Sequence, residues 1–308
     1  MNVDQPHAVR AGSPTDLFAR LLPAGAFTRS IENLVEKDNP DNVIGWPADP
    51  VPHWAKGFHP FSIADLGSGL GGETISMLSR LGQWGCLDNL GEVHLFEHDL
   101  TLSNGSLKTL PQILKDRVES VLKQYVAKSV NIEVHTQSMK LGKTDGRWVV
   151  DPISKYLRQV DLVFASHITY FFDDGSGAHF TDALLQEHLA PEGRLWVNIR
   201  DRQCAVYEAR AAALVALDIR EPQPFDYAEF YRDHVLPHLP AARVLDSSSV
   251  SPRLRAHANR HLAAELMMWR TTIDTVAARS AQVLRSATEQ ASAGDGPLFS
   301  ETQFILGR

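Results

Sequence analysis

The segment from Ile63 to Thr74, IADLGSGLGGET, constrains the fold of this chain more than any other. A short apolar run ends in Asp65, a glycine-rich turn follows, and a helical pattern begins with Glu73 in its first turn. Glycine permits positive φ and lets the backbone approach a ligand closely. A strand that runs through such a turn into a helix presents backbone N–H groups and a positive helix end. The segment therefore predicts an α/β fold with a nucleotide-like ligand at this turn.

Two cofactors fit the glycine pattern. Gly67, Gly69 and Gly72 satisfy the dinucleotide fingerprint, which indicates NAD, although glycines at this density also form ordinary tight loops. Asp65 favours a different ligand. A pyrophosphate gains nothing from a neighbouring carboxylate, whereas a ligand with a cationic amine and a sulfonium is stabilised by one. Glu97, at the end of the next predicted strand, would accept ribose hydroxyls in either case. At this point both an NAD(P)-dependent oxidoreductase and a sulfonium-binding protein remain possible.

The composition of the chain limits which classes of binding partner are expected. With 308 residues, 44% of them hydrophobic, the chain can bury one large core or two modest ones. A net charge of −7 without a basic block argues against nucleic acid as a partner. The two cysteines are far apart, so no disulfide framework is expected and a reducing cytoplasm is the predicted location. Because no apolar run has the length of a membrane span, we expect no membrane partner and a small-molecule substrate.

Strand and helix patterns alternate from Phe61 onward. Strands are predicted over residues 62–65, 92–97, 131–134, 160–165, 194–198, 243–250 and 299–306. Helices are predicted over 73–81 (with Gly82 as its stop), 102–126, 180–189, 205–217, 227–235 and 254–287. This order predicts a Rossmann-like, seven-stranded, mostly parallel sheet with helices on both faces. Residues 1–60 are expected to form an N-terminal lid, and residues 61–308 the main domain, with a late helical insertion at about 251–291.

The Asp-x-Gly-x-Gly arrangement from Asp65 to Gly69 resembles the first motif of class I S-adenosylmethionine methyltransferases, whose strand-end acid faces the methionine half of the cofactor. The seven-strand pattern is similar to that superfamily, whereas dinucleotide-binding folds more often have six parallel strands and a separate substrate domain. The resemblance implies S-adenosylmethionine as the cofactor. The residues it implies as cofactor-binding are Asp65, Gly67, Ser68, Gly69, Gly71, Glu97, Thr136, Gln137, Ser138 and Ser166.

Within the superfamily the chain resembles the histamine N-methyltransferase type over roughly residues 60–308. Three features carry this resemblance: the strand over 161–165 that runs into SHITYFFDD, the insertion, and the last strand. That family has a polar side chain at the position of His167 and acceptor-lining aromatics at those of Tyr170 and Phe171. Here a histidine replaces the family's amide side chain, so the acceptor need not be histamine.

The predicted catalytic residues are His167 and Tyr170. His167 could take a proton from an amine acceptor or orient the nucleophile, and with a thioether it would only position the acceptor. A packed structural histidine is the alternative. Tyr170 and Phe171 could form an aromatic wall for cationic groups, or pack in the core.

Three further residues are predicted to bind the acceptor. Asp173 could bind its amino group, although an Asp-Asp-Gly run is also typical of a solvated turn. Arg200 could bind a carboxylate, or belong to a self-paired surface run over 200–202. Trp269 could line the acceptor site or pack its helix.

No metal site is predicted. Ser166 and His167 stand where magnesium-dependent catechol O-methyltransferases have an acid, and His257 and His261 are interpreted as a solvent-facing pair. The overall prediction is a methyltransferase that acts on nitrogen or sulfur of a small amine or amino acid, for example a histidine-like or methionine-like one. An NAD(P)-dependent oxidoreductase and a non-catalytic S-adenosylmethionine-binding protein are the alternatives.

Overall fold

A computed structural model of the chain describes residues 53–57, 61–69, 71–97, 110–157, 159–166, 168–169, 176–204, 226–239, 243–250 and 300–308. All of these residues belong to one compact unit. Of the predicted lid, only the 3-10 helix η2 (His53–Gly57) is described. The rest of the lid and the predicted insertion lie outside the described residues, so both stay predictions.

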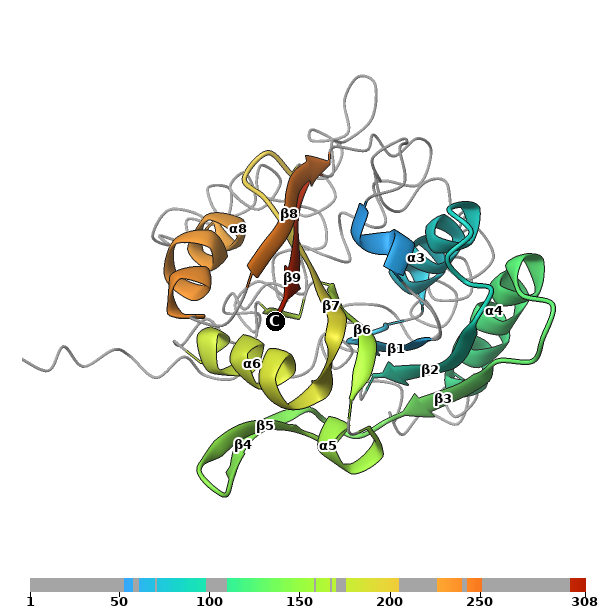
Figure 1. The fold of residues 1–308 in the computed structure, drawn as a ribbon, viewed down its shortest axis with the longest axis horizontal. Helices are drawn as coiled ribbons and strands as arrows, with labels where there is room; N and C mark the ends of the chain where they lie inside the picture. The colour runs from blue at the N-terminus through green and yellow to red at the C-terminus, as the bar shows by residue number, and fades with distance from the viewer. Residues whose placement is uncertain are drawn as a thin grey trace, which may run out of the picture. The chain divides into compact units, whose positions relative to one another are not determined.

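A seven-stranded sheet forms the centre of this unit (Figure 1), in the order β3-β2-β1-β6-β7-β9-β8. Its strands are β1 (Phe61–Leu66), β2 (Leu90–Phe96), β3 (Asn131–His135), β6 (Val160–Ser166), β7 (Leu189–Arg200), β8 (Arg243–Val250) and β9 (Glu301–Gly307). The pairs among β3, β2, β1, β6 and β7 are parallel, whereas β9 is antiparallel to both β7 and β8. This arrangement confirms the predicted Rossmann-like, mostly parallel sheet.

Helices cover both faces of the sheet. Helices α3 (Gly72–Gln83) and α4 (Leu110–Tyr125) pack against each other beside the β1–β3 half (Figure 1). The remaining helical segments are α5 (Ile153–Tyr156), α6 (Gly177–Ala183), α8 (Tyr227–Phe230), the π-helices η6 (Leu184–His188) and η7 (Tyr231–Val235), and the 3-10 helix η8 (Leu236–His238). Strands β4 (Lys140–Thr144) and β5 (Arg147–Asp151) form a separate antiparallel hairpin. Among the described residues, no helix has both the length and the apolar character needed to cross a membrane.

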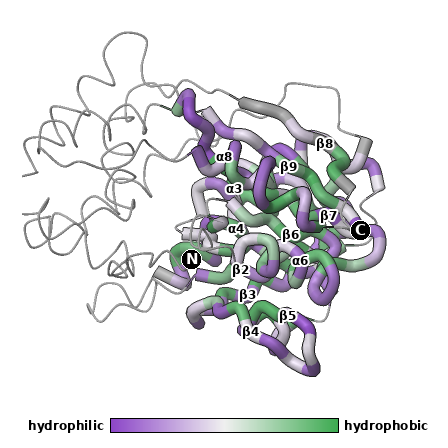
Figure 2. Tube along the Cα trace, turned by 90° about the vertical axis from the view of Figure 1, so that its left-hand side faces the viewer, coloured by the Kyte–Doolittle hydropathy of each residue, from purple (hydrophilic) through white to green (hydrophobic). Residues whose placement is uncertain are grey.

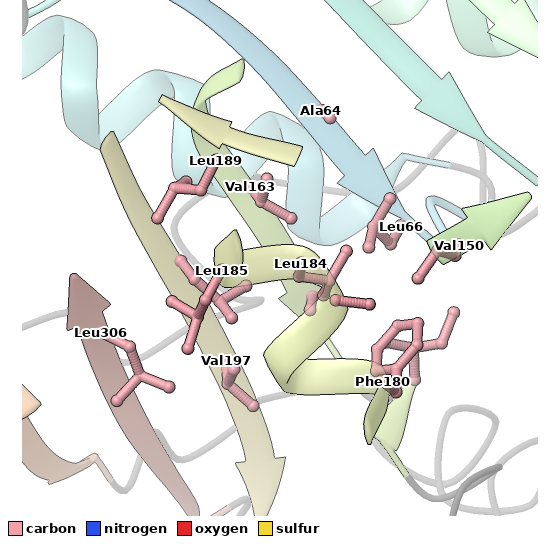
Figure 3. Close-up of a cluster of buried hydrophobic side chains, with 14 of the residues drawn as sticks. Ala64, Leu66, Val150, Val163, Phe180, Leu184, Leu185, Leu189, Val197 and Leu306 are labelled. Carbon is pink, nitrogen blue, oxygen red and sulfur yellow. The ribbon is translucent and has the colours of Figure 1, made fainter. Parts of the chain in front are cut away.

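The core lies where α6 and η6 pack on the sheet. Leu184 and Leu185 point toward Val163 of β6 and Val197 of β7 (Figure 3), and all four side chains are buried. Successive residues of a strand point to opposite faces of the sheet. Phe164 and Trp196, which are next to Val163 and Val197 in their strands, therefore point to the other face. On that face Trp196 contacts Trp54 and Phe164 with ring centroids 5.0 Å and 5.7 Å apart. The two-sided burial explains why β6 and the end of β9 are largely hydrophobic (Figure 2).

Several predicted boundaries were wrong. Helix α3 does not stop at Gly82 but continues to Gln83. A Cβ at Gly82 would lie 2.3 Å from the ring of Tyr125, so the glycine permits close packing on α4 and does not terminate the helix. Strand β7 begins at Leu189, and its pairing with β6 is irregular where a turn was predicted. The β4–β5 hairpin was not predicted.

His188 connects this hairpin to the helical layer. Its ring is buried, and its Nε2 accepts a hydrogen bond of 3.1 Å from the backbone N–H of Val150 in β5. Burial disfavours the charged imidazolium and lowers the pKa of His188 from 6.5 to about 4. The folded protein therefore keeps this ring neutral in mildly acidic solution.

We expect His188 to make folding sensitive to acid. Between about pH 6.5 and 4 the unfolded chain protonates this histidine while the folded chain does not, so stability falls as the pH falls. The loss would be roughly 3 kcal/mol over that window. His188→Gln, which keeps an acceptor for Val150 but cannot titrate, should flatten this part of the profile in urea unfolding measured at several pH values.

His188→Phe provides the matched comparison. It leaves the Val150 N–H without its acceptor, so the free energy of unfolding should fall by about 1–3 kcal/mol even at pH 7. A wild-type acid profile identical to that of His188→Gln would contradict the assignment.

Candidate functional site

The carboxyl group of Asp65 lies at the end of β1 and is almost completely buried, with 2% of the residue exposed. The hydroxyl of Thr74 in α3 donates a hydrogen bond to it. Burial raises the pKa of Asp65 to about 7, opposed by the hydrogen bond from Thr74 and assisted by the negative charges of Glu73 and Glu97. A cation placed beside this carboxyl would favour its charged form.

The turn after β1 uses its own N–H groups inside the protein. The N–H groups of Gly67 and Ser68 both donate to the carbonyl oxygen of Phe96, at 2.8 Å and 3.2 Å. The N–H of Gly69 donates to Glu97 Oε2 at 2.8 Å. The first part of the turn is thus fastened to the end of β2.

Gly71 ends the turn and begins the helix. Its φ of 83° lies in the left-handed region, its N–H donates to the carbonyl of Ser68 at 2.8 Å, and its carbonyl accepts the N–H of Ile75 at 2.9 Å. A Cβ at this position would lie only 2.6 Å from Leu114 Cδ1 of α4. Glycine is therefore required both by the backbone conformation and by the packing of α4.

These contacts restrict the ligand. The described N–H groups of the turn, at positions 67, 68, 69 and 71, all donate to protein acceptors. The negative charges of Glu73 and Glu97 both act on Asp65 at the same turn. A phosphate binds where N–H groups are available and charge is positive, so positions 67, 68, 69 and 71 offer a pyrophosphate no donor and the neighbouring carboxyl groups oppose it. It suits a ligand with cationic and hydroxyl groups.

The predicted cofactor residues of the third strand lie at the same edge of the sheet. The backbone N–H of Glu97 donates to the carbonyl of His135 at 2.9 Å, which joins the ends of the parallel strands β2 and β3. Thr136 follows directly and is half-buried, whereas Gln137 and Ser138 are exposed. Their contact with a cofactor stays a prediction.

A buried polar network lies at the ends of β6 and β7. Asn198 Nδ2 donates to Ser166 Oγ at 3.3 Å and to Glu301 Oε2 at 2.7 Å. Arg200 Nη1 donates to Glu301 Oε1 at 3.0 Å, and the Arg200 side chain is 9% exposed. The interpretation of Arg200 as part of a surface run is therefore wrong. A carboxylate group of the acceptor would have to compete with Glu301 for the Arg200 guanidinium. The predicted role of Arg200 in binding the acceptor therefore stays a prediction.

Some residues of this region were not predicted from the sequence. Thr74 reaches Asp65 across the glycine turn, whereas Asn198 and Glu301 meet between distant segments of the chain. Asn198 Oδ1 is buried without a hydrogen-bond partner. Asn198 and Glu301 both lie within predicted strands, but only the pairing of β7 with β9 brings them together. The predicted acceptor-side residues His167, Tyr170, Phe171, Asp173 and Trp269 lie outside the described residues.

Comparisons with known proteins add little to this picture. No family model matches the chain, and neither does any curated protein. Among solved structures, the chain is similar to the cyclase SpnF, with 12% identity, 98% of each chain covered and a TM-score of 0.46. A coclaurine N-methyltransferase bound to N-methylheliamine and SAH gives 10% identity over 96% of this chain and 92% of that one, with a TM-score of 0.42.

A third structure, a putative type II methyltransferase from Anaeromyxobacter dehalogenans, gives 13% identity over 80% of this chain and 89% of that chain, with a TM-score of 0.38. Similarities of this size give no basis for an activity. The functional argument therefore rests on the residues of the chain itself, and the histamine N-methyltransferase subgroup stays a prediction.

The buried carboxyl makes a prediction about stability. The folded protein holds the Asp65 proton up to about pH 7, whereas the unfolded chain holds it only to about 3.8. Stability should therefore decrease as the pH rises through this window, by on the order of 4 kcal/mol. Asp65→Asn, which keeps an oxygen for Thr74 but never ionises, should unfold at a higher temperature than the wild type at pH 8.

Thermal unfolding at pH 5 and pH 8 checks this prediction, with the exposed Asp88→Asn as the control. A stability difference between Asp65→Asn and the wild type that does not change with pH would contradict it.

Proposed function

We propose that the chain is an S-adenosylmethionine-dependent methyltransferase that methylates nitrogen or sulfur of a small amine or amino acid. The observation that supports this most strongly is the buried Asp65 carboxyl beside a turn whose described N–H groups are already bonded. Such a site would stabilise a positively charged group of the ligand. It also gives no available donors to a phosphate at the four described positions.

The residues fit this cofactor part by part. Asp65 would face the cationic methionine half, and the Glu97 carboxylate would accept ribose hydroxyls, since each of its oxygens can accept more than one hydrogen bond. Thr136, Gln137 and Ser138, at the end of the neighbouring strand, would contact the adenine or ribose, and Ser166 would lie near the methionine half. When bound, the cofactor supplies a methyl group on a positively charged sulfur, which an acceptor atom takes up by in-line displacement.

The acceptor side of the proposal concerns residues beyond the end of β6. His167 would accept the proton that an amine acceptor loses, or position a thioether, which has no proton to lose. Tyr170 and Phe171 would form an aromatic wall, while Asp173 and Trp269 would complete the acceptor site. Holding the acceptor in line in a dry site is an entropic contribution worth up to roughly 7–11 kcal/mol in good intramolecular models.

Arg200 has a more specific place in the proposal. If the acceptor is an amino acid, its carboxylate would share the guanidinium with Glu301, which already bonds Nη1. Asn198 joins this ion pair to Ser166 by its two donated bonds. The network would thereby connect the acceptor side to the cofactor side.

Both alternatives make different demands on the site. An NAD(P)-dependent oxidoreductase would have to place a pyrophosphate among Asp65, Glu73 and Glu97, which like-charge repulsion opposes. A non-catalytic S-adenosylmethionine-binding protein would use the same site without transferring the methyl group. Measuring which cofactor binds distinguishes the oxidoreductase from the proposed methyltransferase. Measuring methyl transfer distinguishes the non-catalytic binding protein from it.

Cofactor binding should depend on pH through Asp65. Because burial raises the pKa of this carboxyl to about 7, the protein must lose a proton before it can present a negative charge. We expect S-adenosylmethionine to bind about tenfold more weakly at pH 6 than at pH 8. Isothermal titration calorimetry would measure this, with NADH titrated in parallel.

In the same experiment Asp65→Asn should bind weakly and without this pH dependence, and Asp88→Asn should behave as the wild type. Binding of NADH without binding of S-adenosylmethionine would overturn the proposal.

His167→Ala should separate binding from turnover. We expect unchanged cofactor affinity but a rate of methyl transfer lowered at least about a hundredfold for an amine acceptor, because general base catalysis is lost. The measurement is transfer of labelled methyl to a panel of amines and amino acids that includes histidine and methionine. Equal rates for variant and wild type would refute the role of His167, and transfer to no acceptor would leave only the binding role.

A further inference from the structure

Two histidines and two glutamates meet on neighbouring strands at the outer edge of the sheet. His94 lies in β2, directly beside Glu133 of the edge strand β3, and His135 is two residues further along β3. Alternate residues of a strand share a face, so these side chains point to the same side of the sheet. Asp65 pairs with Leu95 and therefore points to the opposite side. The cluster is thus separate from the proposed methyl-transfer site.

The potential ligand atoms lie close enough together to contact one metal ion. His94 Nδ1 lies 3.1 Å from His135 Nε2 and 3.7 Å from Glu133 Oε2. His135 Nε2 and Glu133 Oε2 are 3.8 Å apart. Atoms bound to one tetrahedral zinc ion at about 2.1 Å each are about 3.4 Å from one another. One ion could therefore contact all three atoms if they shift by a few tenths of an ångström and the ion replaces the direct hydrogen bond between the two rings.

The surroundings also orient the two rings. Glu92 Oε2 lies 3.3 Å from His94 Nε2, so this carboxylate can hold the proton on Nε2 and leave the Nδ1 lone pair facing the cluster. The ring of His135 packs against those of Phe96 and Tyr156, with centroid distances of 4.5 Å and 4.1 Å. Hydrogen bonding and stacking thus restrain both rings before any ion binds.

The histidines of this cluster are buried, whereas the glutamates are about half exposed. The side chains of His94 and His135 are each 5% exposed, whereas those of Glu92 and Glu133 are 52% and 46% exposed. An ion can therefore enter from solvent past the carboxylates and reach nitrogen donors that are shielded from water. Imidazole with carboxylate suits zinc and related transition metals, whereas magnesium prefers oxygen ligands.

We propose that His94, Glu133 and His135 bind one divalent transition-metal ion of the zinc type, with Glu92 as a positioning residue. The ion would link β2 to the edge strand β3 through His135, the residue whose carbonyl also accepts the backbone N–H of Glu97. It would thereby stiffen the edge of the sheet that precedes the predicted cofactor residues. This role is structural and independent of the proposed methyl transfer.

The test is a metal titration of the full-length chain after treatment with a chelator. Zinc should bind at one site per chain, cobalt(II) should give the visible absorption of a tetrahedral site, and magnesium should not compete. Glu133→Gln and His135→Phe should each weaken zinc binding by roughly a hundredfold, and Glu92→Gln by about tenfold with unchanged stoichiometry. Phenylalanine keeps the stacking at position 135, and Glu133 is half exposed, so both variants should fold.

The exposed His238→Ala serves as the control, because the chain has 13 histidines that can bind metal weakly. Zinc affinity that is the same in the wild type, Glu133→Gln and His135→Phe would overturn the proposal and leave a hydrogen-bonded histidine pair only. A chain that binds zinc but not S-adenosylmethionine would support this inference and overturn the proposed function.

Discussion

The removal of one carboxyl group from water governs the arrangement around the glycine turn. Asp65 lies at the end of β1 with only the Thr74 hydroxyl and neighbouring polar groups to replace its hydration. Burying a charge without a counter-ion is costly, so the folded protein holds this group near the midpoint of its titration at neutral pH. Stability is thereby given up at the position where a cationic ligand would restore it. Shifted pKa values of this kind are typical of functional sites.

The parallel half of the sheet makes this arrangement possible. Strands β1, β2 and β3 are parallel, so Asp65 near the end of β1 lies on the same side of the sheet as Glu97 and Thr136, which follow β2 and β3 directly. The backbone bonds from the turn to Phe96 and from Glu97 to His135 then fasten these ends to one another. The proposed ligand site is thus a consequence of the sheet topology.

The sequence predicted what depends on local composition. The buried strands β1 and β6 are apolar runs between turn signals, and the acid before the glycines is visible in the motif itself. The β4–β5 hairpin was missed because its strands are short and partly exposed, with few apolar residues in β4. Gly82 was misread because its role is contact with Tyr125, a residue of another helix. The cluster of His94 and His135 depends on strand register, which one sequence does not contain.

The position of β9 affects how this sheet can assemble. Among the strands that the structure describes, β8 pairs only with β9, and β9 lies between it and β7. Residues 243–250 therefore have no place in the sheet until residues 301–307 have been synthesised and inserted. Such non-local pairing is slow and exposes a strand edge in the meantime. Pairing of β8 must therefore wait for β9, whereas β1, β2, β3, β6 and β7 can pair before β9 is made.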